Sequence, residues 1–150
     1  MSISKCRVIS LNVRGLHDDG KRNKLFAWLN DRKSDIIFLQ ETFCTDKIED
    51  KVNFSWDGNI YHSLTNSNHS RGVSILFSKD FKHEVVNCVQ SDDGRKLLVN
   101  IKYDDICFTL VSVYAPNEEN VRNLFFQNLS KWIRKHATSL ENVILGGTVA

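Results

Sequence analysis

The sequence predicts an α/β fold in which a mixed β-sheet is flanked by helices. Segments with strand and helix patterns follow one another in the order strand, helix, strand, several hairpins, helix, strand. The run Ile36–Leu39 is continuously apolar, as in a strand that is buried on both faces. Short turn sequences separate the strand-like segments of the middle region and indicate antiparallel hairpins. From these residues alone we expect one mixed sheet with its helices on one face.

The first third of the chain is predicted to alternate strands and helices. Apolar and other side chains alternate before Val13, which is the period of a strand. The polar residues 17–20 supply a turn and a helix cap, and Leu25 and Leu29 follow at helical spacing. The predicted elements are a strand over Cys6–Val13, a helix over Lys21–Asp31, a strand over Ile36–Leu39 and a short helix over Asp46–Lys51.

The middle of the chain is predicted to consist of strands, joined by polar turns. These strands cover Ile60–His62, Val73–Phe77, Val85–Val89, Leu97–Tyr103 and Ile106–Tyr114. A long amphipathic helix is predicted over Glu119–His136, with an apolar stripe that we expect to be core, formed by Val121, Leu124, Phe125, Trp132 and Ile133. A last strand over Val143–Leu145 ends in Gly146 and Gly147.

Composition places the chain among ordinary globular proteins. Its 150 residues are enough for one domain, 41% are hydrophobic, and the net charge of +2 argues neither for nor against a nucleic-acid partner. The four cysteines form no Cys-x-x-Cys motif, and Cys6, Cys88 and Cys107 are expected to be buried free thiols. We expect a soluble, intracellular protein without signal peptide or transmembrane segment, for which a nuclear location is compatible.

Four polar residues lie where strands are predicted to end. Asn12 ends the first strand, Glu41 follows the buried strand, and Tyr114 and Asn117 flank the single proline, Pro116. Ligands gather at strand ends in α/β sheets, and a carboxylate there suits Mg²⁺. Each residue also has an ordinary structural explanation: a turn amide, a loop glutamate, a tyrosine closing a strand, and a helix-capping Asn. The loop around Arg71 is expected to be mostly solvated.

Taken together, the ordered motifs LNVRGL, LQET, SRGVSILFS, DDGRKLLVNI, TLVSVYAPN and VILGG resemble the endonuclease/exonuclease/phosphatase superfamily. The resemblance is nearest to the apurinic-type endonuclease domain of non-LTR, LINE-like retrotransposons. It implies an α/β sandwich of two packed sheets flanked by helices. It also implies Mg²⁺- or Mn²⁺-dependent hydrolysis of phosphodiester bonds, with DNA as the partner that is nicked. By the same resemblance, Asn12 and Glu41 lie at the metal, and Tyr114 and Asn117 contact and stabilise the phosphate.

The sequence departs from the superfamily after Gly146-Gly147. The family carries Asp-x-Asn there, whereas this chain has Thr148 and Ala150 at the two polar positions. The resemblance therefore implies a truncated, N-terminal half-domain over residues 1–150, missing most of the second sheet and catalytically incomplete. An uncovered sheet is expected to cause self-association. Two alternatives stay open: a non-enzymatic nucleic-acid- or protein-binding remnant, and a phosphoesterase of the same superfamily with another substrate.

Overall fold

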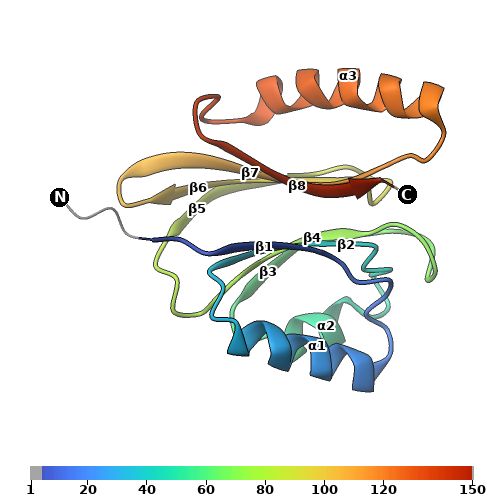
Figure 1. Cartoon of the computed structure of the whole chain (residues 1–150), viewed down its shortest axis with the longest axis vertical. Helices are drawn as coiled ribbons and strands as arrows, with labels where there is room; N and C mark the ends of the chain where they lie inside the picture. The colour runs from blue at the N-terminus through green and yellow to red at the C-terminus, as the bar shows by residue number, and fades with distance from the viewer. Residues whose placement is uncertain (1–4, 150) are drawn as a thin grey trace.

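Two β-sheets lie face to face, with helices on both outer surfaces (Figure 1). The computed structural model describes residues 5–149. In chain order the elements are β1 (Val8–Asn12), α1 (Asp19–Asp31), β2 (Ile36–Gln40), α2 (Glu49–Ser55), β3 (Asn59–Ser63), β4 (Val73–Phe77), β5 (Glu84–Gln90), β6 (Lys96–Tyr103), β7 (Ile106–Ala115), α3 (Glu119–His136) and β8 (Val143–Val149). The predicted α/β class is confirmed.

Each sheet is mixed and has four strands. The first sheet has the order β1-β2-β4-β3 and the second β5-β6-β7-β8. The β1–β2 and β7–β8 pairs are parallel and the other pairs antiparallel. The prediction of one sheet with helices on one face is therefore wrong, and so is the expectation that most of the second sheet is missing. Strand periodicity predicts where each strand lies in the sequence. It does not determine which strands pair, so the same strands fit one sheet or two.

The central core lies between the two sheets. Ile36 and Phe38 of β2, which lies opposite β7 and β8, belong to the same buried cluster as Leu97 and Val99 of β6. Their neighbours point the other way: Ile37 and Leu39 pack under α1, and Leu98 packs under α3. Since both faces of β2 are covered, its residues Ile36–Leu39 form a continuous apolar run rather than an alternating one.

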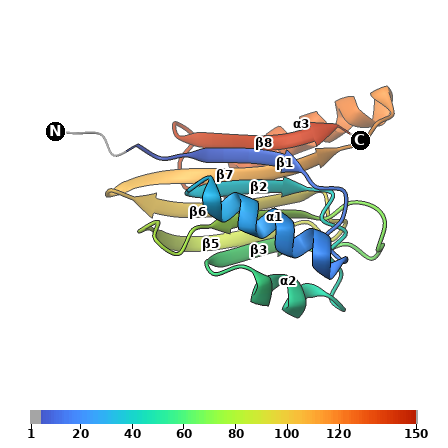
Figure 2. The same cartoon turned by 60° about the horizontal axis from the view of Figure 1, so that its bottom comes forward.

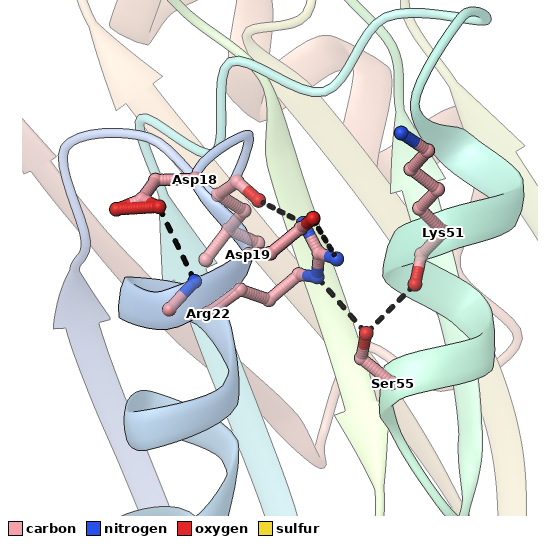
Figure 3. Close-up of polar contacts among 7 residues, drawn as sticks. Asp18, Asp19, Arg22, Lys51 and Ser55 are labelled. Atoms are coloured by element: carbon pink, nitrogen blue, oxygen red, sulfur yellow. Dashed lines mark hydrogen bonds and ion pairs between the residues drawn. The ribbon is translucent and has the colours of Figure 1, made fainter.

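Helices α1 and α2 cover the outer face of the first sheet (Figure 2), and a buried arginine joins them. Arg22 of α1 is only 4% exposed. Its guanidinium donates to the Leu16 carbonyl (2.9 Å), to Ser55 Oγ of α2 (2.9 Å) and to Asp19 Oδ1 (2.7 Å), and Figure 3 shows the Ser55 and Asp19 contacts. Asp18 caps α1 by accepting from the Gly20 N–H, as the sequence predicts for this turn. Arg22 thus ties the β1–α1 loop to α2.

Helix α3 lies over the second sheet and contacts β6 and β7. Leu129 is the centre of this contact and packs on Leu98, Val111 and Val113, with Phe125, Trp132 and Ile133 partly buried around it. Val121 and Leu124 are 46% and 57% exposed, so the predicted core stripe is wrong at these two positions. Leu124 precedes Leu129 by five residues, which places it about 140° away around the helix. The stripe read from the sequence was therefore wider than the contact.

The cysteines are free thiols among the described residues, as expected. Their burial was predicted wrongly for Cys6, which is exposed because β1 begins only at Val8, and for Cys88 and Cys107, which are half-buried. Cys44 is the buried one, and burial raises its pKa to about 12. Over residues 5–149, no helix is long and apolar enough to cross a membrane.

Candidate active site

One edge of the sandwich collects the carboxyl ends of six strands, β1, β2, β3, β5, β7 and β8. The parallel pairs β1–β2 and β7–β8 all end at this edge, on the right in Figure 1, and we call it the rim. The antiparallel strands β4 and β6 begin at the same edge, because Val73 pairs with Gln40 and Lys96 pairs with Val113. Polar side chains at these strand ends can therefore meet although they are far apart in the sequence.

A hydrogen bond between the sheets defines the centre of the rim. The Tyr114 hydroxyl of β7 donates to Glu41 Oε1, directly after β2, over 3.2 Å. Tyr114 is 8% exposed and belongs to the core cluster between the sheets, whereas Glu41 is half-buried. Burial, and then the neighbouring Glu41 carboxylate, raise the pKa of the Tyr114 phenol. At neutral pH the phenol thus keeps its proton and can donate a hydrogen bond to a carboxylate or to a phosphate oxygen.

Asn12 lies next to this pair and reaches the second sheet. Its Cα is in register with Gln40, the residue before Glu41. The Asn12 side chain is exposed, and its Nδ2 donates to Thr148 Oγ1 of β8 over 3.3 Å. Thr148, the residue that departs from the superfamily motif, therefore lies within the group of predicted site residues.

Asn117 lies at the outer side of the rim. Its backbone carbonyl accepts from the Arg122 guanidinium (3.1 Å), and the residue is exposed. It is not the capping residue of α3, because the N-cap is Glu118 and no side chain caps this helix. Asn12, Glu41 and Tyr114 thus come together at the rim, while Asn117 stays exposed just beyond the end of β7.

The backbone of the rim is strained in the segment that presents Glu41. Glu41 and Phe43 have φ values of 53° and 55°, a left-handed conformation that is uncommon for residues other than glycine. Neighbouring loops hold this segment: the Gly15 N–H donates to the Glu41 carbonyl (2.6 Å), and the Thr42 N–H donates to the Gly72 carbonyl (3.0 Å). A Cβ on Gly72 would come within 2.5 Å of Thr42 Oγ1, so only glycine permits this approach.

The donor atoms at the rim fit a hydrated magnesium ion better than a fully protein-bound one. No group of three or more His, Cys, Asp or Glu side chains within residues 5–149 is placed to hold a metal ion. Mg²⁺ commonly uses one or two carboxylates and keeps several waters, so Glu41 and the Asn12 amide are the residues that could hold it. Gln40 adds an observation: it is fully buried, its Nε2 donates to Ser10 Oγ (3.1 Å), and its Oε1 has no donor among the described residues. A bound water would satisfy this oxygen.

Sequence reasoning missed one residue of the rim, Arg95. Its Nη1 donates to the Tyr114 carbonyl (3.0 Å), its own carbonyl accepts from the Tyr114 N–H (2.9 Å), and its guanidinium lies 5.4 Å from the centre of the Tyr114 ring. The sequence signal was the Asp92-Asp93-Gly94 turn before it, which indicates a hairpin and nothing about the residue that follows.

Comparisons with known proteins agree with this fold. The family model described as "Endonuclease/Exonuclease/phosphatase family" matches residues 9–147. The chain is 30% identical over 141 residues to the "Transposon TX1 uncharacterized 149 kDa protein" of Xenopus laevis, a match that covers 93% of this chain and 11% of that protein. The chain therefore belongs to the endonuclease/exonuclease/phosphatase family, and the resemblance found in the sequence motifs is confirmed.

Solved structures share the fold at low sequence identity. The mannosyl-6-phosphatase Bt3783 of Bacteroides thetaiotaomicron has a TM-score of 0.72 and 14% identity, over 95% of this chain and 64% of that one. The endonuclease domain of TRAS1, a telomere-specific non-LTR retrotransposon, has a TM-score of 0.65 and 18% identity, over 95% of this chain and 58% of that one. The chain thus spans less than two thirds of each structure. At these identities the likeness establishes the fold alone.

Proposed function

We propose that the rim is a metal-dependent DNA phosphodiesterase site of the retrotransposon endonuclease type, in which a second carboxylate is replaced by Thr148. The observation that carries the proposal is the Tyr114–Glu41 hydrogen bond, which brings a phenol and a carboxylate from opposite sheets to one point of the rim. Two similarities support the proposal. The chain is similar in sequence to the transposon protein of Xenopus laevis and similar in fold to the TRAS1 endonuclease domain.

In this proposal each rim residue has a separate task. Glu41 holds Mg²⁺ or Mn²⁺ with the help of the Asn12 amide oxygen. A bound divalent ion supplies positive charge that polarises the phosphate and acidifies water. The Tyr114 hydroxyl and the Asn117 amide are hydrogen-bond donors for the non-bridging phosphate oxygens, where negative charge grows during attack.

Thr148 limits the chemistry that the rim can perform. Its hydroxyl accepts from Asn12, but an uncharged hydroxyl does not take a proton from water at neutral pH, as a carboxylate can. A missing general base costs about 10²–10⁴ in rate and a missing electrostatic stabiliser about 10²–10³, and the two losses do not simply multiply. We therefore expect hydrolysis about four orders of magnitude slower than in a complete site.

Thr148 also favours a second candidate function, that of a DNA-binding module without hydrolysis. Such a module needs only the phosphate contacts of Tyr114 and Asn117, and it leaves Thr148 without a chemical role. A phosphoesterase acting on a small monoester is the third candidate. The structural likeness to the mannosyl-6-phosphatase supports it only at the level of the fold.

Manganese binding and plasmid nicking together test the proposal. Electron paramagnetic resonance of Mn²⁺ reports binding to the chain, and supercoiled plasmid reports hydrolysis with Mg²⁺ or Mn²⁺. Glu41→Gln keeps the shape of the side chain and removes its charge. The matched control is Glu84→Gln. Glu84 is exposed, and it is the first residue of β5, at the end of the sandwich opposite the rim.

We expect Mn²⁺ binding that Glu41→Gln abolishes and Glu84→Gln preserves, with nicking barely above the Glu41→Gln level. Equal Mn²⁺ binding by the wild type and Glu41→Gln contradicts the metal role of Glu41. DNA binding without any Mn²⁺ binding favours the non-enzymatic module instead.

A further inference from the structure

The rim continues beyond Glu41 and Tyr114, and the next polar groups along it are two arginines. In the first sheet β4 lies beside β2, and Arg71 precedes β4 by two positions. In the second sheet β6 lies beside β7, and Arg95 directly precedes β6. Arg71 and Arg95 are thus one strand further along the rim than Glu41 and Tyr114. Neighbouring strands are about 4.8 Å apart.

The backbones around the two arginines are hydrogen-bonded to each other. The Gly72 N–H donates to the Gly94 carbonyl over 2.8 Å, which joins the residue after Arg71 to the residue before Arg95. A Cβ on Gly94 would come within 2.9 Å of the Gly72 nitrogen, so the two loops are in close contact. The positive charge of Arg71 is also near enough to lower the pKa of Arg95, an effect that ranks behind burial and the opposing influence of Asp93.

The Arg95 side chain and the Arg71 main chain are each held by a backbone contact rather than by a carboxylate. Arg95 is held by the Tyr114 carbonyl, and the Arg71 carbonyl accepts from the Phe43 N–H over 3.0 Å, two residues after Glu41. Among residues 5–149 the only ion pair within 4 Å is Arg22–Asp19, on the outer face of the first sheet. The nearby carboxylates Asp93 and Glu41 form no such ion pair within the described residues. Asp93 Oδ1 accepts instead from the Arg95 backbone N–H and from Ser91 Oγ.

We propose that Arg71 and Arg95 form a binding subsite for a second phosphate, next to the one at Glu41 and Tyr114, and that the substrate is therefore a polynucleotide. The inference rests on the proposed function of the rim. Two half-buried guanidiniums without carboxylate partners present planar donors that match phosphate oxygens. Because a phosphate monoester carries one phosphate, it can fill the Glu41 position or the arginine pair but not both. A nucleic-acid strand fills both with successive phosphates.

The placement also defines the path of the bound strand. It runs across the rim, from Asn12 and Thr148 past Glu41 and Tyr114 to Arg71 and Arg95, in the direction in which the strands follow one another in both sheets. Arg95 touches two positions of this path, since it also holds the Tyr114 carbonyl.

Fluorescence anisotropy of a labelled DNA duplex, in EDTA and at a series of NaCl concentrations, tests the subsite. We expect Arg71→Gln and Arg95→Gln each to weaken binding about tenfold at moderate salt and to reduce the slope of log Kd against log salt by about 1. Arg95→Lys retains the charge and is expected to retain most of the slope. Inorganic phosphate and mannose 6-phosphate at millimolar concentration are expected to leave the duplex bound.

Lys33→Gln is the matched control. Lys33 is exposed, has a left-handed backbone (φ 52°) like that of Arg71, and precedes β2 at the end of the sheet opposite the rim. An unchanged salt slope in Arg71→Gln, or an equal loss in Lys33→Gln, overturns the subsite. Arg71 makes no side-chain bond to Tyr114 among the described residues, so Arg71→Gln decides the question if Arg95→Gln does not fold. Binding in EDTA needs neither metal nor hydrolysis, so the subsite and the proposed phosphodiesterase activity can fail separately.

Discussion

Tyr114 and Glu41 are 73 positions apart in the chain, yet the Tyr114 hydroxyl donates to the Glu41 carboxylate across the two sheets. The bond forms only when the sheets are stacked, because each sheet contributes one partner. The centre of the candidate site and the packing of the sandwich are therefore one structural feature.

Removing this bond is expected to cost stability. Tyr114→Phe deletes the donor and leaves the partly buried Glu41 acceptor without it, so we expect the free energy of unfolding to fall by about 1 kcal/mol. Urea denaturation followed by circular dichroism measures the change. Tyr103→Phe is the control, because the Tyr103 side chain packs in the core and its hydroxyl has no hydrogen bond within residues 5–149. Equal losses in the two variants would show that the Tyr114 hydroxyl contributes nothing.

A second carboxylate at position 148 is expected to strengthen the metal site. Thr148→Asp places a negative charge beside Asn12, and two carboxylates are a usual donor set for Mg²⁺. We expect at least a tenfold rise in Mn²⁺ affinity, about 1.4 kcal/mol, and nicking that becomes measurable above the Glu41→Gln level. Thr148→Asn is the matched neutral control. If the two variants bind Mn²⁺ equally, position 148 does not reach the metal.

His62 is expected to make stability depend on pH in the acid range. It is buried, with Nδ1 2.6 Å from Ser74 Oγ and Nε2 2.7 Å from Asn53 Oδ1, and burial lowers its pKa to about 4. The unfolded chain has the higher pKa of about 6.5, so between these values it binds more protons than the native state. Stability is therefore complete above about pH 6.5 and falls as the pH drops toward 4, by about 3 kcal/mol in all.

Urea denaturation at neutral pH and near pH 4.5 measures this loss. His62→Gln is expected to remove most of the difference between the two conditions, and substitution of the exposed His69 by Gln is expected to leave it unchanged. A wild-type chain that is equally stable at both pH values would contradict the role of His62.

Arg22→Leu is expected to destabilise the outer layer strongly. The substitution removes three hydrogen bonds and leaves the buried Leu16 carbonyl without a donor, so we expect a loss of about 3 kcal/mol. Asp19→Asn removes only the exposed end of the same network and is expected to change stability little. Thermal unfolding of both variants provides the comparison. Similar melting temperatures for Arg22→Leu and the wild type would show that the network is not stabilising.

Self-association is expected through β8, although both sheets have covered inner faces. Val143, Leu145 and Val149 are 36%, 52% and 49% exposed, because α3 lies over β6 and β7 and leaves β8 bare. One edge of β8 pairs with β7, and no described strand pairs with the other edge. Sedimentation velocity at several concentrations is expected to show association that Leu145→Lys reduces and that Phe54→Lys, on the exposed side of α2, does not. A monomer at every concentration would contradict this expectation.

The sequence predicts the elements well and their arrangement poorly. β4 and α3 have the predicted bounds, because alternation and helical spacing leave a clear local signal. The division into two sheets depends on which strands pair, and a continuous apolar run such as that of β2 fits either arrangement. The position of Glu41 beside Tyr114 follows from the strand ends, and the sequence could predict it. Arg95 could not be found in this way, since its contacts exist only through packing between distant loops.

The glycine pair of β8 has a mechanical consequence for the rim. A Cβ on Gly146 would lie 2.7 Å from the Phe38 ring of the opposite sheet, so the bare backbone is what lets the sheets approach at this point. A side chain at Gly146 would act as a wedge between the layers. Its effect would reach the rim two residues later, where it would pull Thr148 away from Asn12. The spacing of the two layers, and with it the width of any groove across the rim, is thus set by a residue that contributes no chemical group.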